Sequence, residues 1–416
     1  MMIIDREELM DKLISLKGTR LIKVISGIRR SGKSFLLFNL FYGHLLRTGV
    51  DEGHILRYEL DAMENERLRN RYALYDDIKS RITDNEQYYV FIDEIQLVDS
   101  FFEVLNSLLH KENVDVYVTG SNSRFLSSDI VTEFRGRSME IRVRPLSFSE
   151  FAAAKGIDPR DCIEEYMDYG GMPELFKIDD PEQKTNYLKN LMSKVYISDI
   201  VERRNIRYSD ELENITDLLC SSIGSLNNVV KITNTLRTVK KSKITDKTVK
   251  AYLDSLCDSF LFERSMRYDI KGRRYFDSQS KFYIADTGLK NARENFRQAE
   301  RTHVMENIIY NELRSRGYDV DVGVVNITST EGGVRKVIGI EVDFVANKGN
   351  ERIYIQSAYH MTDESREREI RPFLKMNDSF KKVVITDDTV SRRMDDDGIL
   401  TIGLIEFLMD RNSLQI

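Results

Sequence analysis

Residues 21–40 combine three local patterns in one fixed order, and this order limits what the chain can fold into. An apolar run at 21–25 (LIKVI) is typical of a buried strand, and the segment GIRRSGKS at 27–34 follows it. The next six residues (FLLFNL) predict a helix that begins at Lys33 or Ser34. A strand, a glycine-bounded loop and a helix in this order, with the spacing Gly-x-x-x-x-Gly-Lys-Ser, predict a phosphate-binding loop of the Walker A type.

Each part of this loop suits the binding of a nucleoside triphosphate. The glycines allow successive backbone N–H groups to face an anion, and the N-terminus of the helix adds its positive dipole end. Lys33 is placed to reach the β- and γ-phosphates, and the Ser34 hydroxyl is placed to hold a Mg²⁺ ion. A chance turn between a strand and a helix is the alternative. We expect ATP to be bound by Gly27, Arg30, Ser31, Gly32, Lys33, Ser34 and Phe35.

A second strand, with acidic residues at its end, lies further along the same alternating pattern. Residues 88–94 (YYVFIDE) form an apolar run that ends in Asp93 and Glu94, which is the form of a Walker B segment. Asp93 is placed to hold Mg²⁺ together with Ser34, and Glu94 is placed to polarise the attacking water. Two surface acids that cap a strand are the alternative. Further apolar runs at 54–61 and 114–118 extend the pattern, which predicts an α/β fold with a parallel sheet.

Polar residues after the next predicted strand, and arginines before a fifth one, complete the candidate catalytic set. Asn122 is the first candidate to orient the hydrolytic water, with Ser121 and Thr119 as alternatives, although a plain turn has the same composition. Arg135 and Arg137 carry the guanidinium group that suits transition-state charge on a phosphoryl group. Either is a candidate arginine finger acting on a neighbouring subunit, or else a solvated loop arginine. A finger that acts in trans requires an oligomer.

The composition limits the remaining function classes. A chain of 416 residues exceeds one ordinary hydrophobic core, so two or three domains are expected. No apolar run nears the roughly 18 residues that span a bilayer, and we expect no secretory leader, so we expect a cytoplasmic protein without membrane contact. The 3 isolated cysteines favour a reducing compartment and argue against a zinc site. The net charge of −6 means that any nucleic-acid site must be local.

Several motifs together resemble those of a known family. They are GIRRSGKS, YYVFIDEIQ, VTGSNS, FRGRS, PLSFSEF (145–151) and YGGMPE (169–174). The set is similar to that of the prokaryotic AAA-type ATPases that carry a C-terminal domain of unknown function, the AAA_14/DUF4143 type. The resemblance covers nearly the whole chain. It implies ATP hydrolysis, ring-like assembly, and an AAA core joined to a winged-helix segment and a restriction-endonuclease-like domain.

The expected fold class is therefore α/β, with a P-loop NTPase sheet of the AAA type and a helical lid. A winged-helix domain and a restriction-endonuclease-like α/β domain are expected to follow. The expected boundaries are 1–150 for the ATPase core, 151–205 for the lid, 206–295 for the winged helix and 296–416 for the last domain. The resemblance further implies that Gly170 and Gly171 form a tight turn within the lid.

Residues 210–290 predict three helices followed by a β-hairpin, an order that is common in duplex-binding domains. From Lys231 to Arg274 there are 12 Lys or Arg and 5 Asp or Glu, a local balance of +7. Such clustering suits phosphate contacts, so we expect DNA to bind here, whereas a role in packing or protein contact is the alternative. The candidate contacts are Lys243, Lys247 and Lys250 near the third helix, and Lys271, Arg273 and Arg274 on the hairpin.

The last domain has the order helix, three strands, helix, strand, which is similar to the restriction-endonuclease-like fold. The metal site of that fold needs a helix Glu, a strand Asp and a later Glu-x-Lys. Glu306 and Asp343 fit the first two places, but the third reads QSA and begins at Gln356. A neutral Gln oxygen is a poorer Mg²⁺ ligand than a carboxylate. Lys348 and Lys375 are the candidate substitutes for the missing lysine, and we expect a degenerate, nuclease-like domain that does not cleave.

These expectations combine into one function. The chain is expected to hydrolyse ATP with Mg²⁺ and to couple its nucleotide state to DNA handling by the winged-helix and nuclease-like domains, as a homo-oligomer. One alternative is an ATP-dependent regulatory switch that assembles with a protein partner, and another is an active ATP-dependent nuclease. A small-molecule kinase is disfavoured because Asp93 and Glu94 suit water as the phosphoryl acceptor.

Overall fold

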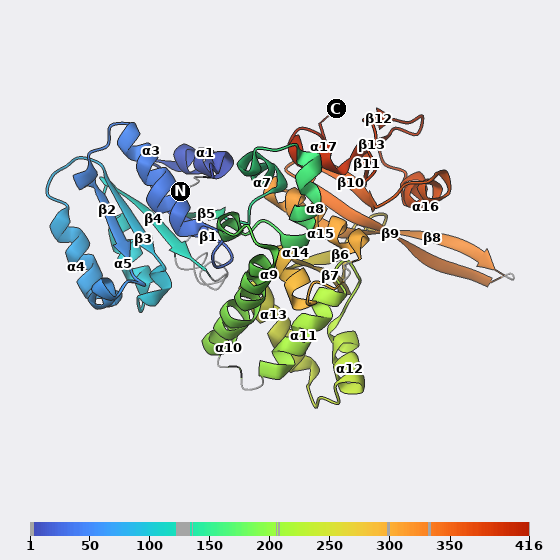
Figure 1. Ribbon diagram of the computed structural model, residues 1–416, viewed down its shortest axis with the longest axis horizontal. Coiled ribbons are helices and arrows are strands. Elements are labelled where there is room, and N and C mark those ends of the chain that lie inside the picture. Colours follow the sequence, from blue (N-terminus) through green and yellow to red (C-terminus); the bar gives the residue numbers. More distant parts are fainter. Residues whose placement is uncertain are drawn as a thin grey trace. The chain divides into compact units, whose positions relative to one another are not determined.

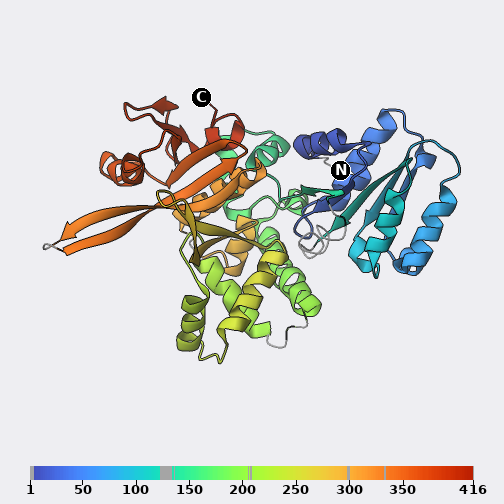
Figure 2. The same ribbon diagram turned by 180° about the vertical axis from the view of Figure 1, so that it is seen from behind.

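The computed structural model describes the backbone of residues 4–121, 134, 136–204, 206, 209–297, 300–331 and 334–415 (Figures 1 and 2). Within these ranges, side chains are not described at 203, 277, 278, 328–331, 334–336 and 363–365. The contacts between residues divide the chain into two compact units. The first unit comprises Met1–Pro145 with Asp258–Phe260, and the second comprises Leu146–Cys257 with Leu261–Ile416.

A parallel five-stranded sheet forms the centre of the first unit. Its strands are β1 (Ile22–Ser26), β2 (Ile55–Glu59), β3 (Tyr88–Asp93), β4 (Val114–Gly120) and β5 (Ser138–Arg142). They lie in the order β2-β3-β4-β1-β5, and every neighbouring pair is parallel. β1 and β3 are buried along their whole length, as expected for strands covered by helices on both faces. The predicted α/β fold with a parallel sheet is confirmed, and the strand order places β4 between β1 and β3.

Helices pack against both faces of this sheet. On one face α4 (Arg71–Arg81) and α5 (Phe101–Leu109) contribute Leu74 and Leu105 to a core that contains Val90. On the other face α1 (Glu7–Leu16) and the helix that follows the phosphate loop pack against Phe91. That helix consists of α2 (Lys33–Phe35), a π-helical stretch η1 (Leu36–Phe41) and α3 (Tyr42–Arg47). Three 3₁₀ turns complete the unit, η2 (Glu52–His54), η3 (Met63–Arg69) and η4 (Ile95–Leu97).

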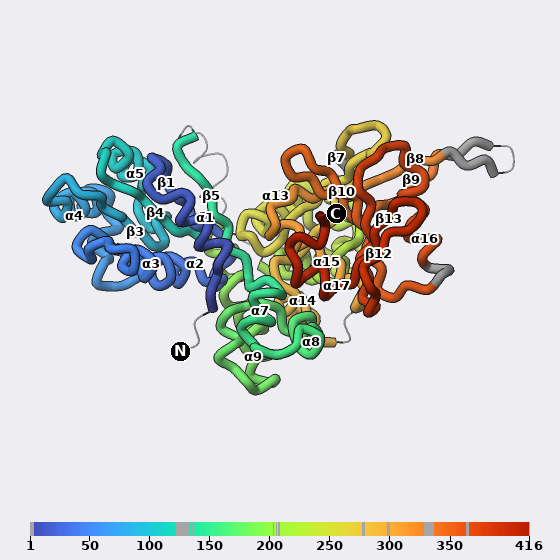
Figure 3. Tube along the Cα trace, turned by 90° about the horizontal axis from the view of Figure 1, so that it is seen from above, coloured from blue at the N-terminus to red at the C-terminus, as the bar shows by residue number. Residues whose placement is uncertain are grey.

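The second unit contains an eight-stranded mixed sheet in the order β12-β13-β11-β10-β9-β8-β6-β7. Its strands are β6 (Phe262–Asp269), β7 (Arg274–Ile284), β8 (Asp319–Glu331), β9 (Val334–Lys348), β10 (Glu351–Ala358), β11 (Lys381–Thr386), β12 (Arg393–Met394) and β13 (Ile399–Gly403). The hairpin β6–β7, which the sequence analysis interprets as a wing, is part of this sheet because β6 pairs in parallel with β8. β8 and β9 extend beyond the other strands as a two-stranded ribbon (Figures 1 and 3).

Two helices cover opposite faces of this second sheet. α15 (Arg301–Ser315) places the Tyr310 ring 6.4 Å from that of Phe344. α16 (Asp363–Leu374) contributes Phe373 to a core that includes Val345. Because Phe344 and Val345 are consecutive in β9, their side chains point to opposite faces. α17 (Leu404–Met409) follows β13 at the end of the chain.

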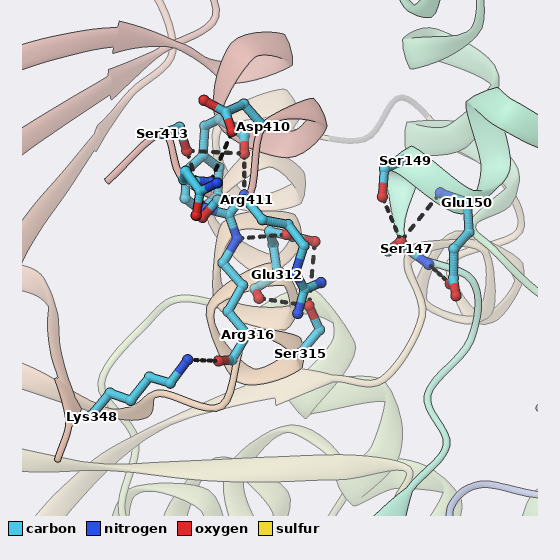
Figure 4. Close-up of polar contacts among 12 residues, drawn as sticks. Ser147, Ser149, Glu150, Glu312, Ser315, Arg316, Lys348, Asp410, Arg411 and Ser413 are labelled. Carbon is cyan, nitrogen blue, oxygen red and sulfur yellow. Dashed lines mark hydrogen bonds and ion pairs between the residues drawn. The ribbon is translucent and has the colours of Figure 1, made fainter. Parts of the chain in front are cut away.

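The other helices of the second unit lie mainly before the sheet in sequence. They are α7 (Phe148–Lys155), α8 (Pro159–Tyr169), η6 (Pro173–Lys177), α9 (Pro181–Asn190), η7 (Leu191–Ile197), α10 (Ser198–Arg204), α11 (Ser209–Ser221), α12 (Val229–Val239), α13 (Asp246–Asp258) and α14 (Thr287–Arg293). α7 begins with a capping box, in which the Ser147 hydroxyl accepts from the Glu150 N–H and the Glu150 carboxylate accepts from the Ser147 N–H (Figure 4). The three helices predicted over 210–290 are present as α11, α12 and α13.

Gly170 and Gly171, which follow α8, lie against Asp286, the N-cap residue of α14. Gly170 ends α8 with φ of 74°, and a Cβ atom there would lie 2.1 Å from Oδ1 of Asp286. The Gly171 N–H donates to the other Asp286 carboxylate oxygen at 2.7 Å. A Cβ on Gly171 would lie 2.2 Å from the Leu146 carbonyl oxygen. The glycine pair is therefore required by contact with a buried carboxylate as well as by the turn itself.

Among the helices that the structure describes, none has the length and apolar character needed to cross a membrane.

Candidate functional site

The phosphate loop connects β1 to α2, and its glycines are required by geometry. Gly27 has φ of 142°, and a Cβ atom at this position would lie 2.0 Å from the Val143 carbonyl oxygen. Gly32 has φ of 96°, again in the region that favours glycine. Arg30, between them, is exposed and has φ of 63°. At Gly27 and Gly32, the two ends of the loop, the backbone therefore adopts conformations that most other residues cannot adopt.

Lys33 and Ser31 supply the polar groups inside this loop. Lys33 is 4% exposed, and its Nζ atom donates to the carbonyl oxygens of Gly27 and Ile28, each 3.0 Å away. The Ser31 hydroxyl is buried without a hydrogen-bond partner among the described residues. A buried ammonium and an unpartnered buried hydroxyl in one glycine-bounded loop fit an anion such as a phosphate group.

The Walker A and Walker B segments meet where β1, β3 and β4 end. The Ser34 hydroxyl lies 2.9 Å from both carboxylate oxygens of Asp93, so it can donate to either. The Thr119 hydroxyl, from β4, donates to Asp93 Oδ1. Burial raises the pKa of Asp93, although both hydroxyl donors act in the opposite direction. Ser34 and Asp93 are thus the pair that could hold a divalent cation, whose charge would favour the ionised carboxylate.

Glu94 follows Asp93 in a left-handed conformation with φ of 48°. Its backbone N–H donates to the Thr119 hydroxyl at 3.0 Å, so one threonine contacts both acidic residues. The half-buried Glu94 carboxylate accepts from the Ser121 hydroxyl at 3.3 Å and from the Gln96 side-chain amide. These contacts orient the carboxylate at the edge of the sheet, where it could polarise a water molecule.

The other predicted site residues are distributed as follows. Asn122 and Arg135 lie outside the described residues, whereas the alternatives Thr119 and Ser121 both contact the acidic pair. Arg137 is exposed; its N–H donates to the Phe134 carbonyl, and its carbonyl oxygen accepts from the Ile22 N–H. Phe35 is half-buried and lines a groove of 820 Å³, whose walls include α1 and the helix that follows the phosphate loop.

Two residues near the loop, Gln96 and Arg6, were given no role in the sequence analysis, although Gln96 is the last residue of the motif YYVFIDEIQ. Gln96 contacts Glu94 as described above. Arg6 is buried and donates to the Arg144 carbonyl at 2.9 Å and to the Ser31 carbonyl at 3.4 Å. Arg6 thus ties the segment before α1 to the phosphate loop. A contact across 25 residues to a main-chain oxygen leaves no pattern in the sequence.

The predicted nuclease-like residues form a cluster in the second unit. Glu306 from α15, Asp343 from β9 and Gln356 from β10 lie near one another. The Asp343 N–H donates to Gln356 Oε1 at 3.3 Å, and the Ser357 N–H donates to Asp343 Oδ2 at 2.9 Å. The Gln356 amide in turn donates to Glu369 at 3.1 Å. Gln356 is therefore engaged by hydrogen bonds on both sides.

A lysine that the sequence analysis did not consider lies at the centre of this cluster. Lys281, from β7, is 2% exposed, and its Nζ atom is 2.8 Å from Glu306, 2.7 Å from Glu341 and 3.6 Å from Asp343. Burial acts to lower the pKa of Lys281, but the three carboxylates raise it by more. Burial raises the pKa of Glu306 to about 7, against the effect of Lys281. We call these four residues the Lys281 cluster.

The two lysines suggested as substitutes lie elsewhere. Lys348 donates to the Arg316 carbonyl at 2.8 Å, just beyond the end of α15 (Figure 4). Glu306 is ten residues earlier, or about 15 Å along a helix that rises 1.5 Å per residue. Lys375 is exposed in the segment after α16. Within the described part of the chain, no group of three or more His, Cys, Asp or Glu side chains is placed to hold a metal ion.

The six predicted nucleic-acid contacts are all exposed. Lys243, Lys247 and Lys250 lie just before α13 and in its first turns, and Lys271, Arg273 and Arg274 lie at the β6–β7 turn. Arg274 lies 3.8 Å from the Asp269 carboxylate. The two groups belong to different structural settings, a helix start and the edge of a sheet.

A parallel sheet in the order β2-β3-β4-β1-β5, with a phosphate loop after β1 and an Asp-Glu pair after β3, defines a P-loop protein of the AAA type. Residues 19–152 match the family AAA_14, described as an AAA domain, and residues 160–300 match a domain of unknown function, DUF8612. An uncharacterized protein of Haemophilus influenzae is 33% identical over 412 residues, 98% of each chain. The chain belongs to this family of AAA-domain proteins.

Two further similarities are weaker. An uncharacterized protein of Methanocaldococcus jannaschii is 27% identical over 93% of this chain and 87% of its own. The Aeropyrum pernix Orc1 protein in complex with DNA aligns over 70% of this chain and 92% of its own, with 11% identity and a TM-score of 0.30. A score this low carries no conclusion about this chain.

Proposed function

We propose that this protein hydrolyses ATP and couples its nucleotide state to the handling of nucleic acid by the second unit. One observation carries the ATPase part: Thr119 contacts both Asp93 and Glu94, while Ser34 donates to Asp93. The phosphate loop, the two residues that would hold the cation (Ser34 and Asp93) and the carboxylate that would orient the water therefore meet at one edge of the sheet. Phosphoryl transfer to water requires this arrangement.

The residues have separate roles in this proposal. Lys33 and the backbone N–H groups of the loop hold the β- and γ-phosphates of ATP. Ser34 and Asp93 hold Mg²⁺, which when bound neutralises charge that develops on the phosphate oxygens. Glu94, oriented by Ser121 and Gln96, takes the proton of the attacking water. Thr119 fixes the positions of Asp93 and Glu94 relative to each other, because its hydroxyl contacts both.

The oligomer is part of the same proposal. Hydrolysis in this class needs a guanidinium to stabilise the charge of the transferred phosphoryl group. Arg137 is exposed, so its side chain is available to a neighbouring subunit, and Arg135 is the other candidate. We therefore propose a homo-oligomer, ring-shaped if each subunit supplies its arginine to the next.

Nucleic acid is the proposed target because of local charge. The stretch from Lys231 to Arg274 has a balance of +7 in a chain of −6, and its six candidate contacts are exposed. Counterion release from nucleic acid would favour binding there at moderate salt. We interpret α11–α13 with β6–β7 as a winged helix whose wing is continuous with the neighbouring sheet.

For the last part of the chain we propose binding or assembly without cleavage. The order α15-β8-β9-β10-α16-β11 supports a restriction-endonuclease-like fold, and Glu306 and Asp343 stand at its acidic places. Lys281 lies among those carboxylates, where a divalent cation would otherwise bind, and Gln356 replaces a carboxylate. Both features oppose metal-dependent hydrolysis.

The test is steady-state ATP hydrolysis by the full chain, with and without single-stranded and duplex DNA, over a range of salt. Stimulation by DNA that fades as salt rises is the expected result. Lys33→Ala should lose ATP affinity, and Glu94→Gln should bind ATP without turning it over. Normal turnover by Glu94→Gln would contradict the catalytic assignment. Hydrolysis indifferent to DNA would instead favour a regulatory switch that acts on a protein partner.

A further inference from the structure

A pocket of 680 Å³ lies at one edge of the sheet in the second unit. Three connections enclose it: the β6–β7 turn, the β9–β10 turn, and the segment between α16 and β11. The buried rings of Tyr268 and Tyr354 line it, together with the more exposed Phe380. Its volume is within the range of about 300–1,000 Å³ typical of small-molecule sites. The pocket belongs to a different unit from the phosphate loop, so it is a second candidate binding site.

The charges that line this pocket favour an anion. Lys271, Arg273 and Arg352 line it, and none of them forms an ion pair with a carboxylate among the described side chains. Its two carboxylates already have hydroxyl donors. Glu351 accepts from the Tyr318 hydroxyl at 2.8 Å, and Asp378 accepts from the Tyr354 hydroxyl at 2.9 Å.

Two aromatic rings of the pocket lie close to the Arg352 guanidinium. The guanidinium carbon lies 5.2 Å from the centre of the Tyr268 ring and 5.4 Å from that of Phe380. The Asn347 side-chain oxygen accepts from Arg352 Nε at 2.8 Å, which fixes the plane of the guanidinium. Phe380 is 40% exposed. A planar cation and an accessible aromatic ring on one wall are the surfaces on which nucleic-acid bases stack.

We propose that this pocket holds one nucleotide of a single-stranded nucleic acid. Lys271 and Arg273 contact its phosphate, and its base stacks on Phe380 beside Arg352. A base within a duplex is stacked on both faces and cannot enter a pocket, so the site selects an unpaired segment or a strand end. The inference rests on the proposed role in handling nucleic acid and identifies the form of nucleic acid that is bound.

The experiment uses the full chain with Lys33→Ala, which removes nucleotide binding at the phosphate loop. Fluorescence anisotropy of a labelled 12-nucleotide oligothymidylate gives the Kd over a salt series. Lys271→Gln/Arg273→Gln is compared with Lys79→Gln/Lys194→Gln, which removes the same charge from exposed positions outside the pocket. The pocket variant should bind about tenfold more weakly, and its salt slope should fall by about 0.7, the value for one phosphate of a single strand. Phe380→Leu should weaken binding about tenfold at every salt concentration.

Each outcome decides one part of the proposal. Equal affinities for the pocket variant and its matched control would overturn the pocket but leave nucleic-acid binding, and thus the proposed function, in place. Failure of both the Lys33→Ala chain and the unaltered chain with ATP to bind any strand would overturn both. Displacement of the strand by 5′-AMP, added at the same nucleotide concentration, would overturn the strand as the occupant and assign the pocket to free nucleotides. Loss of affinity in Phe380→Leu, without such displacement, supports the strand.

Discussion

The side-chain nitrogen of Lys281 lies 2.8 Å from Oε1 of Glu306, although the two residues come from different elements and both are buried. The Tyr283 hydroxyl donates to the same oxygen at 2.7 Å. Glu341 and Asp343 complete the surroundings of the ammonium group. A divalent cation bound by these carboxylates would have to approach a fixed positive charge, so the buried ammonium group opposes metal binding here.

Replacement of Lys281 by Met should destabilise the second unit strongly. Met is similar in length, so the main loss is the charge that balances three carboxylates, and removal of one partner from a buried ion pair costs about 3–5 kcal/mol. Urea unfolding followed by tyrosine fluorescence would measure the free energy of unfolding. The double variant Lys281→Met/Glu306→Gln should recover part of the loss, because it also removes the closest buried charge. A single-variant loss below about 1 kcal/mol would show that the cluster is not a balanced charge centre.

Replacement of Thr119 by Val should reduce kcat for ATP hydrolysis with little change in ATP affinity. Val keeps the shape but lacks the hydroxyl that donates to Asp93 and accepts from the Glu94 N–H. Loss of such a supporting contact typically costs about 10- to 100-fold in activity. Thr119→Ser retains the hydroxyl and is the matched control. Similar kcat values for Thr119→Val and the unaltered chain would remove Thr119 from the catalytic set and leave Asn122 as the candidate.

Gly27→Ala should abolish ATP binding, whereas Gly43→Ala should not. A Cβ on Gly27 would lie 2.0 Å from the Val143 carbonyl oxygen, so the loop or the segment just after β5 must move. A Cβ on Gly43 would meet only the flexible end of Arg47, at 3.4 Å. Alanine is favoured over glycine within a helix by roughly 0.5–1 kcal/mol, so Gly43→Ala should preserve or raise stability. Calorimetric titration with ATP would compare the two variants, and unimpaired binding by Gly27→Ala would contradict the observed loop path.

The features that could be predicted from the sequence are those that depend on residues close together in the chain. The loop between β1 and α2 lies within a run of 14 residues, and Asp93 ends an apolar strand at the expected place. Parallel strands place their carboxyl ends on one edge, so contact between Ser34 and Asp93 could also be expected. The pairing of β4 with β1 could not be predicted, because the order of strands depends on tertiary packing.

Long-range pairing explains what the sequence analysis missed in the second unit. β6 pairs with β8 through Arg267 and Val322, which are far apart in sequence, so a hairpin interpreted as a separate wing becomes part of the larger sheet. The contact between Lys281 in β7 and Glu306 in α15 is also long-range, because the two residues are 25 positions apart in sequence. A search for a substitute lysine within the last expected domain could find Lys348 or Lys375 but not a residue of the preceding hairpin.

The stability of the second unit should depend on pH through Asp286, the buried carboxyl that accepts from the Gly171 N–H. Burial raises the pKa of Asp286 to about 6, while the backbone donors act against this shift. The folded state therefore binds a proton more tightly than the unfolded state, whose Asp has a pKa near 3.8. Stability from this group is fully present below about pH 4 and is lost as the pH rises through about 6, by at most about 3 kcal/mol.

Asp286→Asn keeps an accepting oxygen but cannot ionise. The difference in free energy of unfolding between the unaltered chain and Asp286→Asn should therefore move in favour of the variant between pH 4 and pH 7. A constant difference over this range would mean that the carboxyl is stabilised by its backbone donors as fully as it would be by water.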